Sequence, residues 1–213
     1  KYKSSIDSLG RVLFEIITVE LGQNIIFENK LPKEVVQDYQ SELSQNPNLP
    51  IEILSSNDTT QISDLLDYFL FYNPPKDLNL KQLNTSITKL YNSNISLLFK
   101  RKLIRLSGSL FSKGNIEFIA LILDSIKSDN HYLQLEAVQT INKYKISHLE
   151  ANNILLILLK DSPKDQNYEL LNLKKEILLA LARINHPDFF IISDKFLQQN
   201  NPILTGSILY SYG

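Results

Sequence analysis

Hydrophobic residues recur along this 213-residue chain at helical spacing, and the same arrangement appears several times. Steps of four, four and three residues separate Leu133, Ala137, Ile141 and Tyr144. Such steps place side chains on one face of a helix. The steps begin again at Leu173, about 40 residues later, and also at Phe99, about 34 residues earlier. We therefore expect a series of equivalent helices at a regular interval.

A second set of apolar segments alternates with these helices. It comprises Ile116–Lys127, Ala151–Lys160 and Phe189–Gln198. Leu78–Tyr91 and Ile95–Phe111 form an earlier pair of the same kind, and Ile203–Tyr212 is a further helical segment. Two helices per unit, with a period of roughly 34 to 47 residues, are typical of stacked helical hairpins. We call the two helices of each predicted hairpin its first helix and its second helix.

Residues 1–58 are less regular, and we treat them as an N-terminal helical segment with a linker, separate from repeats over 59–213. Ser5–Leu21 favours a helix over a strand, because charged residues recur between its apolar ones at helical spacing. Lys33–Leu43 predicts a short helix, and Asp58 is the expected cap of the next one. The turn-forming clusters in Ser44–Thr59 indicate either a linker or a long loop within the array.

One joint between the predicted hairpins carries a resemblance to a known family. Ile177–Asp188 ends in Leu-Ala-Arg-Ile-Asn-His-Pro-Asp and resembles the inter-repeat signature of HEAT repeats, and Phe118–Tyr144 resembles one full HEAT unit. The likeness covers roughly residues 78–213, although Asn185 stands where glycine is common and Ser107 replaces an apolar residue. The resemblance implies an all-α fold, a right-handed α-solenoid of stacked hairpins; an armadillo-type array would share the pattern.

Composition narrows the possible functions. The formal net charge is −1, so the overall basic balance of nucleic-acid binders is absent. The chain has no cysteine, which excludes disulfides and thiolate metal sites. Its longest apolar run, Ile154–Leu159, is too short to span a bilayer. We expect a cytoplasmic protein and, because the chain begins at Lys1 without a methionine, a piece of a larger one.

No sequence motif for catalysis is present: GxSxG, Walker, GxGxxG and HExxH patterns are all missing. His131, His148 and His186 fall at predicted turns or helix starts and share no metal-ligand spacing. Asp64 and Asp67 lie three residues apart on one predicted helix, which ordinarily indicates a solvated face. We therefore name no catalytic, metal-binding or cofactor-binding residue and expect no cofactor.

Basic residues supply the candidate binding site. Lys100 and Lys174 occupy equivalent positions in their second helices, as do Lys143 and Arg183, with Ser109 at the matching place. Equivalent positions in a stacked array form a stripe, and the HEAT resemblance implies that second helices line the concave side. The partner-binding candidates are Lys100, Arg101, Arg105, Lys143, Lys174 and Arg183. The alternative is a solvated face, with charges offset by nearby Glu136 and Glu176.

The function that this pattern favours is a non-catalytic scaffold or protein-interaction module that binds a protein or an acidic peptide. One alternative is an enzyme or enzyme accessory of HEAT-like type, related to bilin attachment or to excision of DNA bases. The other is a purely structural segment of a larger machine. The aromatic residues Tyr68, Phe69, Phe71 and Tyr72 are interpreted as core rather than as an exposed anchor.

Overall fold

The computed structural model describes residues 31–56, 58–161, 168–199 and 201–212, and within these ranges the chain is all-helical, with no strand. The α-helices are α2 (Lys33–Gln45), α3 (Leu49–Ser55), α4 (Thr59–Phe71), α5 (Leu80–Tyr91), α6 (Leu97–Ser112), α7 (Ile119–Ile126), α8 (His131–Tyr144), α9 (Leu149–Asp161), α10 (Tyr168–Arg183), α11 (Phe189–Leu197) and α12 (Pro202–Tyr212). A 3-10 turn, η1 (Ile116–Phe118), leads into α7. The helix predicted over Ser5–Leu21 lies outside the described residues.

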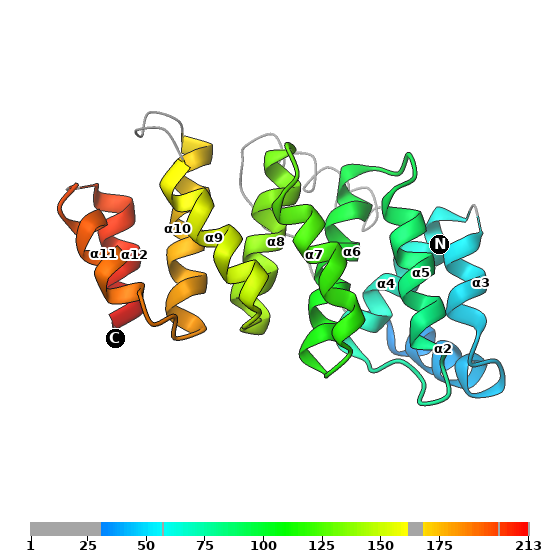
Figure 1. The fold of residues 1–213 in the computed structure, drawn as a ribbon. Helices are drawn as coiled ribbons and strands as arrows, with labels where there is room; N and C mark the ends of the chain where they lie inside the picture. Colours follow the sequence, from blue (N-terminus) through cyan, green and yellow to red (C-terminus); the bar gives the residue numbers. More distant parts are fainter. Residues whose placement is uncertain (1–30, 57, 162–167, 200, 213) are drawn as a thin grey trace.

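The helices pack in two rows. In one row, which we call the second row, α4, α6, α8, α10 and α12 each contact the next. In the other, the first row, α3 contacts α5, η1 contacts α5, and α7 contacts α9. Figure 1 shows the helices following one another along the length of the molecule, from α2 and α3 at one end to α11 and α12 at the other.

The repeated apolar positions form the core between the rows. Ala137, Ile141, Ile177 and Leu181 are all 0% exposed. The spacing that predicts these helices therefore also predicts correctly which of their faces is buried. Burying such side chains stabilises the fold because each removes apolar surface from water.

Three second-row helices end in the same backbone motif. Gly114, Lys145 and Asn185 follow α6, α8 and α10 with positive φ angles of 95°, 51° and 53°. The N–H of the residue after each of them donates to a carbonyl five residues back, on Leu110, Ile141 and Leu181 respectively. This left-handed ending satisfies carbonyls that a helix end leaves without partners. Asn185 thus does what glycine does elsewhere, since asparagine tolerates this conformation better than most residues.

The shared ending also sets the register between the second-row helices. It aligns Lys143 with Arg183, two residues after Ile141 and Leu181. The residue of α6 at the same distance from Leu110 is Ser112, not Ser109. The apolar spacing predicted that Ser109 of α6 is equivalent to Lys143 and Arg183. The shared ending instead makes Ser112 the equivalent residue, three positions further along the chain.

The segment interpreted as a linker contains a helix. α3 lies within it and contacts both α4 and α5, with Pro50, Ile53 and Leu54 buried. Proline early in a helix costs no hydrogen bond, so the Leu49-Pro50 start suits a short helix as well as a turn. The cap at Asp58 is confirmed, because its carboxylate accepts hydrogen bonds from the backbone N–H groups of Thr60 and Gln61.

Candidate functional site

Buried polar contacts join neighbouring helices of the second row. Between α4 and α6, the Lys102 ammonium donates to Asp67 at 3.0 Å and to the Ser63 hydroxyl at 3.1 Å. Between α6 and α8, Arg101 Nε donates to Glu136 Oε2 at 3.0 Å. Because these groups are buried, the contacts lie inside the helix–helix interfaces rather than on the surface.

Glu136 is the centre of this set of contacts. Its side chain is fully buried, and its second carboxylate oxygen accepts a hydrogen bond from Arg105 Nε. Two arginines therefore neutralise one carboxylate. A buried charge in such a position is tolerated only when it is paired and hydrogen-bonded, as this one is. The next contact along the second row joins an uncharged amide to a carboxylate. Asn142 Nδ2 of α8 donates a hydrogen bond to Glu176 Oε2 of α10 at 3.2 Å.

These contacts divide the six basic candidates. Arg101, Arg105 and Lys174 are buried, with exposed fractions of 4%, 9% and 4%. The solvated-face interpretation is therefore wrong for Lys174, and also for Asp67, which is 5% exposed and ion-paired. Helix α6 is enclosed because α4, α5, α7 and α8 all contact it. Several of its charged side chains are therefore buried against neighbouring helices instead of being exposed to solvent.

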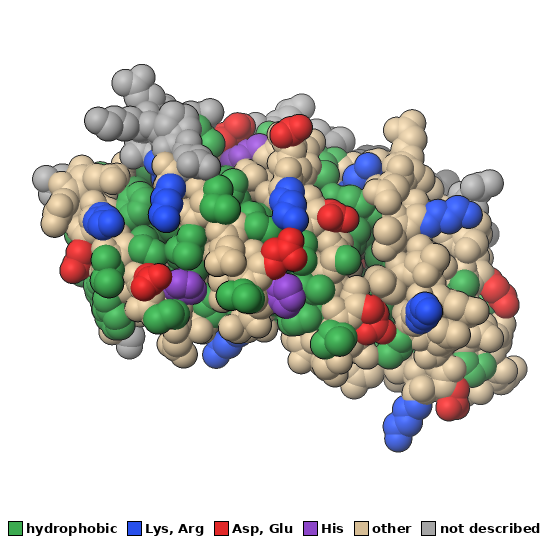
Figure 2. Space-filling model, viewed as in Figure 1, with side chains coloured by type: hydrophobic (Ala, Val, Ile, Leu, Met, Phe, Trp, Pro, Cys, Tyr) green, Lys and Arg blue, Asp and Glu red, His purple; other side chains and the backbone are tan. Residues whose placement is uncertain are grey.

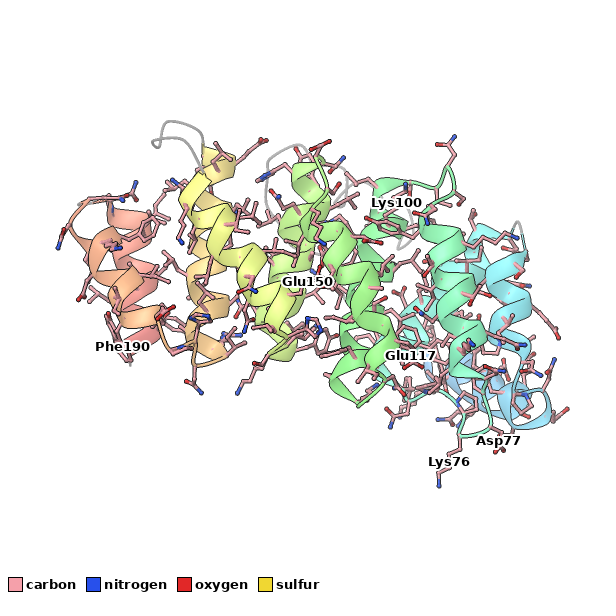
Figure 3. The ribbon with its side chains drawn as sticks, in the orientation of Figure 1. Lys76, Asp77, Lys100, Glu117, Glu150 and Phe190 are labelled. Carbon is pink, nitrogen blue, oxygen red and sulfur yellow. The ribbon has the colours of Figure 1, made fainter. Side chains whose placement is uncertain are left out.

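The other three candidates lie at the surface. Lys100 is half-buried in the first turn of α6 (Figure 3). Its ammonium lies 5.4 Å from the centroid of the Tyr91 ring. Lys143 and Arg183 are exposed in the last turns of α8 and α10. A cation in the last turn of a helix interacts favourably with the helix dipole.

Lys143 and Arg183 meet at a cleft of about 270 Å³ across α6, α8 and α10. Its lining comprises Arg105, Glu136, Gln139, Thr140, Asn142, Lys143, Glu176 and Arg183. Glu136 lies three and four residues before Gln139 and Thr140, and Lys143 lies four and three residues after them, so one face of α8 forms the wall of the cleft. The structure thus brings Arg105, Lys143 and Arg183 together, and it does not bring Lys100, Arg101 or Lys174 into this lining.

Three residues that line the cleft carry a buried polar atom. Gln139 Oε1, Thr140 Oγ1 and Asn142 Oδ1 are buried and have no hydrogen-bond partner among the residues that the structure describes. Asn142 uses its amino group on Glu176, which leaves the carbonyl oxygen needing a donor. Buried polar groups in folded proteins are nearly always satisfied by protein groups or by ordered water, so these three side chains make the wall of the cleft polar.

The electrostatics of the cleft are mildly positive at its rim. Its lining has three cationic and two anionic side chains, and Glu136 is already paired with two arginines. Glu176 lies 3.1 Å from the ammonium of neighbouring Lys175. Partial burial lowers the pKa of Lys143, whose ammonium lies 5.5 Å from the centroid of the Tyr144 ring. Such a rim can bind a carboxylate with charge-assisted hydrogen bonds.

Sequence reasoning did not identify Gln139, Thr140 and Asn142 as part of a site. The available signal was their position, because Thr140 and Asn142 flank the buried position Ile141 in the predicted core helix. Polar residues at such positions are unusual, but only the placement of α10 beside α8 shows what they face.

A larger cleft of about 540 Å³ lies at the other end of the molecule, near Lys76 and Asp77 (Figure 3). Tyr68 lies in its lining and stacks on Tyr72, with ring centroids 4.9 Å apart. Tyr68 and Phe69 are buried as expected for core residues, whereas Phe71 and Tyr72 are 36% and 37% exposed. Only the first pair fits the interpretation as core.

The first-row face is more apolar than the second-row cleft. Figure 2 shows hydrophobic side chains gathered over the half of this face that carries α7, α9 and α11. The large exposed ones include Ile116, Leu149, Ile157, Phe190 and Ile191. Charged and histidine side chains lie among them, so the apolar surface is divided rather than continuous.

Two further properties concern the described residues only. No cluster of three or more His, Asp or Glu residues is placed to hold a metal ion in the parts of the chain that the structure describes. No helix in those same parts is long and apolar enough to cross a membrane. His131 begins α8, and His148 and His186 lie just before α9 and α11, where the sequence predicts them.

Comparison of the chain with protein-family models, with curated proteins and with solved structures gives no match. Any functional conclusion therefore depends on the geometry of this chain. Within the described residues, the cleft across α6, α8 and α10 combines charged and other polar side chains from three helices, and it is therefore the candidate binding site.

Proposed function

We propose that this chain is a HEAT-like α-solenoid that acts as a non-catalytic protein-interaction module and binds acidic peptide segments on its second-row surface. The solenoid part of the proposal is supported by the two rows of helices and by the ending shared by α6, α8 and α10. A backbone motif that recurs with the repeat period is what an array of equivalent hairpins requires.

The observation that carries the binding function is the cleft itself. Two exposed cations from different helices, Lys143 and Arg183, line it together with further polar side chains, among them Gln139 and Glu176. A peptide segment supplies side-chain carboxylates for the cations and backbone N–H groups for polar side chains of the lining. A nucleic acid fits less well, because its binding depends on several phosphate contacts and the lining offers two exposed cations, Lys143 and Arg183.

The test is a selection from a random peptide library displayed on phage, with the immobilised chain as bait. We expect enrichment of sequences rich in Asp and Glu. Synthetic versions of the enriched peptides should bind the Lys143→Glu/Arg183→Glu variant at least about tenfold more weakly, because each lost contact is charge-assisted.

A matched control is the Lys81→Glu/Lys89→Glu variant, which makes the same change of charge on α5, away from the cleft. This control should bind the peptides as the unmodified chain does. A second variant, Lys143→Gln/Arg183→Gln, with thermal unfolding of all variants, shows whether a loss of binding reflects a loss of fold. Enriched peptides that are not acidic, or that bind every variant equally, would overturn the proposal.

A further inference from the structure

A second groove adjoins the charged cleft along the second row. It has a volume of about 430 Å³ and lies between α10 and α12. Leu179, Ala182 and Arg183 form its α10 side, and Tyr210 and Ser211 form its α12 side. Arg183 lines both the cleft and this groove, so the two make one elongated surface with a charged part and an apolar part.

The apolar part has the composition of an anchor site. Helix α12 has no charged residue between Pro202 and Tyr212, and the Tyr210 side chain is 73% exposed. Leu179 and Ala182, in the same lining, are half-buried. An exposed aromatic ring beside an aliphatic floor can enclose a large apolar side chain, and pockets of this kind supply much of the affinity in peptide recognition.

From these two adjoining parts, we infer that the second-row surface recognises a bipartite segment: an acidic residue seated against Lys143 and Arg183, and a large apolar residue seated between α10 and α12. This inference rests on the proposed function and specifies the class of its partner. Charge complementarity favours the acidic residue, and the absence of charged residues on α12 favours the apolar one.

The geometry also sets the spacing of the two elements. Packed helices have axes about 8 to 10 Å apart, so the two grooves beside α10 are separated by roughly that distance. An extended chain advances about 3.3 Å per residue. A segment that crosses α10 in an extended conformation should therefore carry its apolar residue about three residues from its acidic one.

The experiment uses fluorescein-labelled synthetic peptides with fluorescence anisotropy. An acidic peptide with one Phe about three residues from the nearest Glu is compared with the same peptide carrying Ser in place of Phe. We expect the Phe peptide to bind about tenfold more tightly, because the ring leaves water on binding. Moving the Phe to a separation of one residue should remove most of this advantage.

The matching protein variant is Tyr210→Ser, which should reduce binding of the Phe peptide to the level of the Ser peptide. Tyr168→Ser is its control: Tyr168 is 66% exposed at the start of α10 and lies outside both linings. Both residues are exposed, so neither substitution removes core packing.

The outcomes separate the two proposals. Equal binding of the Phe and Ser peptides, both weakened by the Lys143→Glu/Arg183→Glu variant, would overturn the bipartite inference and leave the proposed function standing. No difference between that variant and the unmodified chain would overturn the proposed function as well. A Phe advantage that survives Tyr210→Ser would show that the anchor lies elsewhere and would also overturn the inference.

Discussion

The Lys102 ammonium on α6 lies 3.0 Å from both carboxylate oxygens of Asp67 on α4, and only 5% and 7% of the two side chains are exposed. Two charges taken out of water in this way cost desolvation energy that their attraction only partly returns. The pair therefore contributes more to the alignment of α4 and α6 than to net stability. It also makes the interface sensitive to the loss of either partner alone.

The first prediction follows from that asymmetry. Lys102→Met should destabilise the chain by about 3–5 kcal/mol, because it removes the ammonium that is ion-paired with the buried Asp67 carboxylate. Asp67→Leu should cost a similar amount for the corresponding reason. The double variant should recover most of the loss, since it removes both buried charges together. Urea unfolding of the four proteins measures the coupling between the two sites.

An exposed ion pair provides the comparison for this cycle. Lys127, just after α7, and Glu150 on α9 lie 2.8 Å apart, but half of each side chain is exposed. Glu150→Gln should leave the urea midpoint almost unchanged, because solvent screens such pairs. Equal losses for the buried and exposed pairs, or a double variant as unstable as the sum of the single ones, would contradict the prediction.

The second prediction concerns the closest approach of α6 and α8. A methyl group added at Gly108 would lie 2.2 Å from Thr140 Cγ2 and 3.0 Å from the Tyr144 ring. Thr140 is β-branched and stiff, so it cannot turn away at low cost. Gly108→Ala should destabilise the chain by about 1–3 kcal/mol despite the better helix propensity of alanine. Thermal or urea unfolding measures the change.

Two variants test that explanation. Thr140→Ser removes the Cγ2 methyl and should restore much of the stability lost in Gly108→Ala. Gly206→Ala on α12 meets nothing within 4 Å and should instead stabilise the chain by about 0.5–1 kcal/mol, since alanine loses less backbone entropy than glycine. A destabilising Gly206→Ala together with a harmless Gly108→Ala would refute the steric argument.

The sequence predicted the helices and their buried faces because both depend on local spacing. Ala137, Ile141, Ile177 and Leu181 were expected inside and are all fully buried. The same reasoning placed Asp67 on a solvated face, because a charged side chain ordinarily stays in water. Its burial depends on Lys102, which is 35 residues away and which spacing along one helix cannot reveal.

The candidate site also has one property that local spacing predicts and others that depend on contacts between helices. The alignment of Lys143 with Arg183 follows from the repeat and could be predicted from the sequence. The cleft between them depends on how closely α8 and α10 pack and on which polar atoms remain without partners, and Thr140 and Asn142 illustrate this. Those properties arise from contacts between helices that no single helix encodes.

The third prediction uses the repeated helix ending. Lys145 adopts a φ of 51°, whereas the equivalent position after α6 is Gly114. A residue with a Cβ is strained in this region by roughly 1–2 kcal/mol, and glycine is not. Lys145→Gly should therefore stabilise the chain, by about 1 kcal/mol after the extra entropy of glycine in the unfolded state is subtracted. Urea unfolding again gives the measurement.

The control for this substitution is Lys127, which also follows a helix but has a φ of −83°. No strain is relieved there, so Lys127→Gly should leave stability unchanged or lower it. If Lys145→Gly and Lys127→Gly shift the urea midpoint in the same direction by the same amount, the left-handed ending is not the cause.

The last prediction concerns pH. Burial, followed by the nearby carboxylates of Asp64, Glu42 and Asp58, raises the pKa of Tyr39 from 10.0 to about 12. Below pH 10 the phenol is neutral in both the folded and the unfolded chain. Between about pH 10 and 12 the unfolded chain releases the proton while the folded chain retains it, so stability falls through this window.

Tyr39→Phe has no such proton to release. Its stability should fall less steeply with pH than that of the unmodified chain between about pH 10 and 12, because unfolding of the variant releases up to one proton fewer in this range. Burial also raises the pKa of Tyr68, Tyr91 and Tyr144, and these tyrosines contribute to the slope in both proteins. The variant also loses the 3.3 Å hydrogen bond from the Tyr39 hydroxyl to the Gln61 carbonyl, which lowers stability equally at every pH. Urea unfolding from pH 8 to 12, together with tyrosinate absorbance of the folded proteins, separates the two effects. Parallel stability curves for the two proteins would mean that Tyr39 ionises alike in the folded and unfolded states.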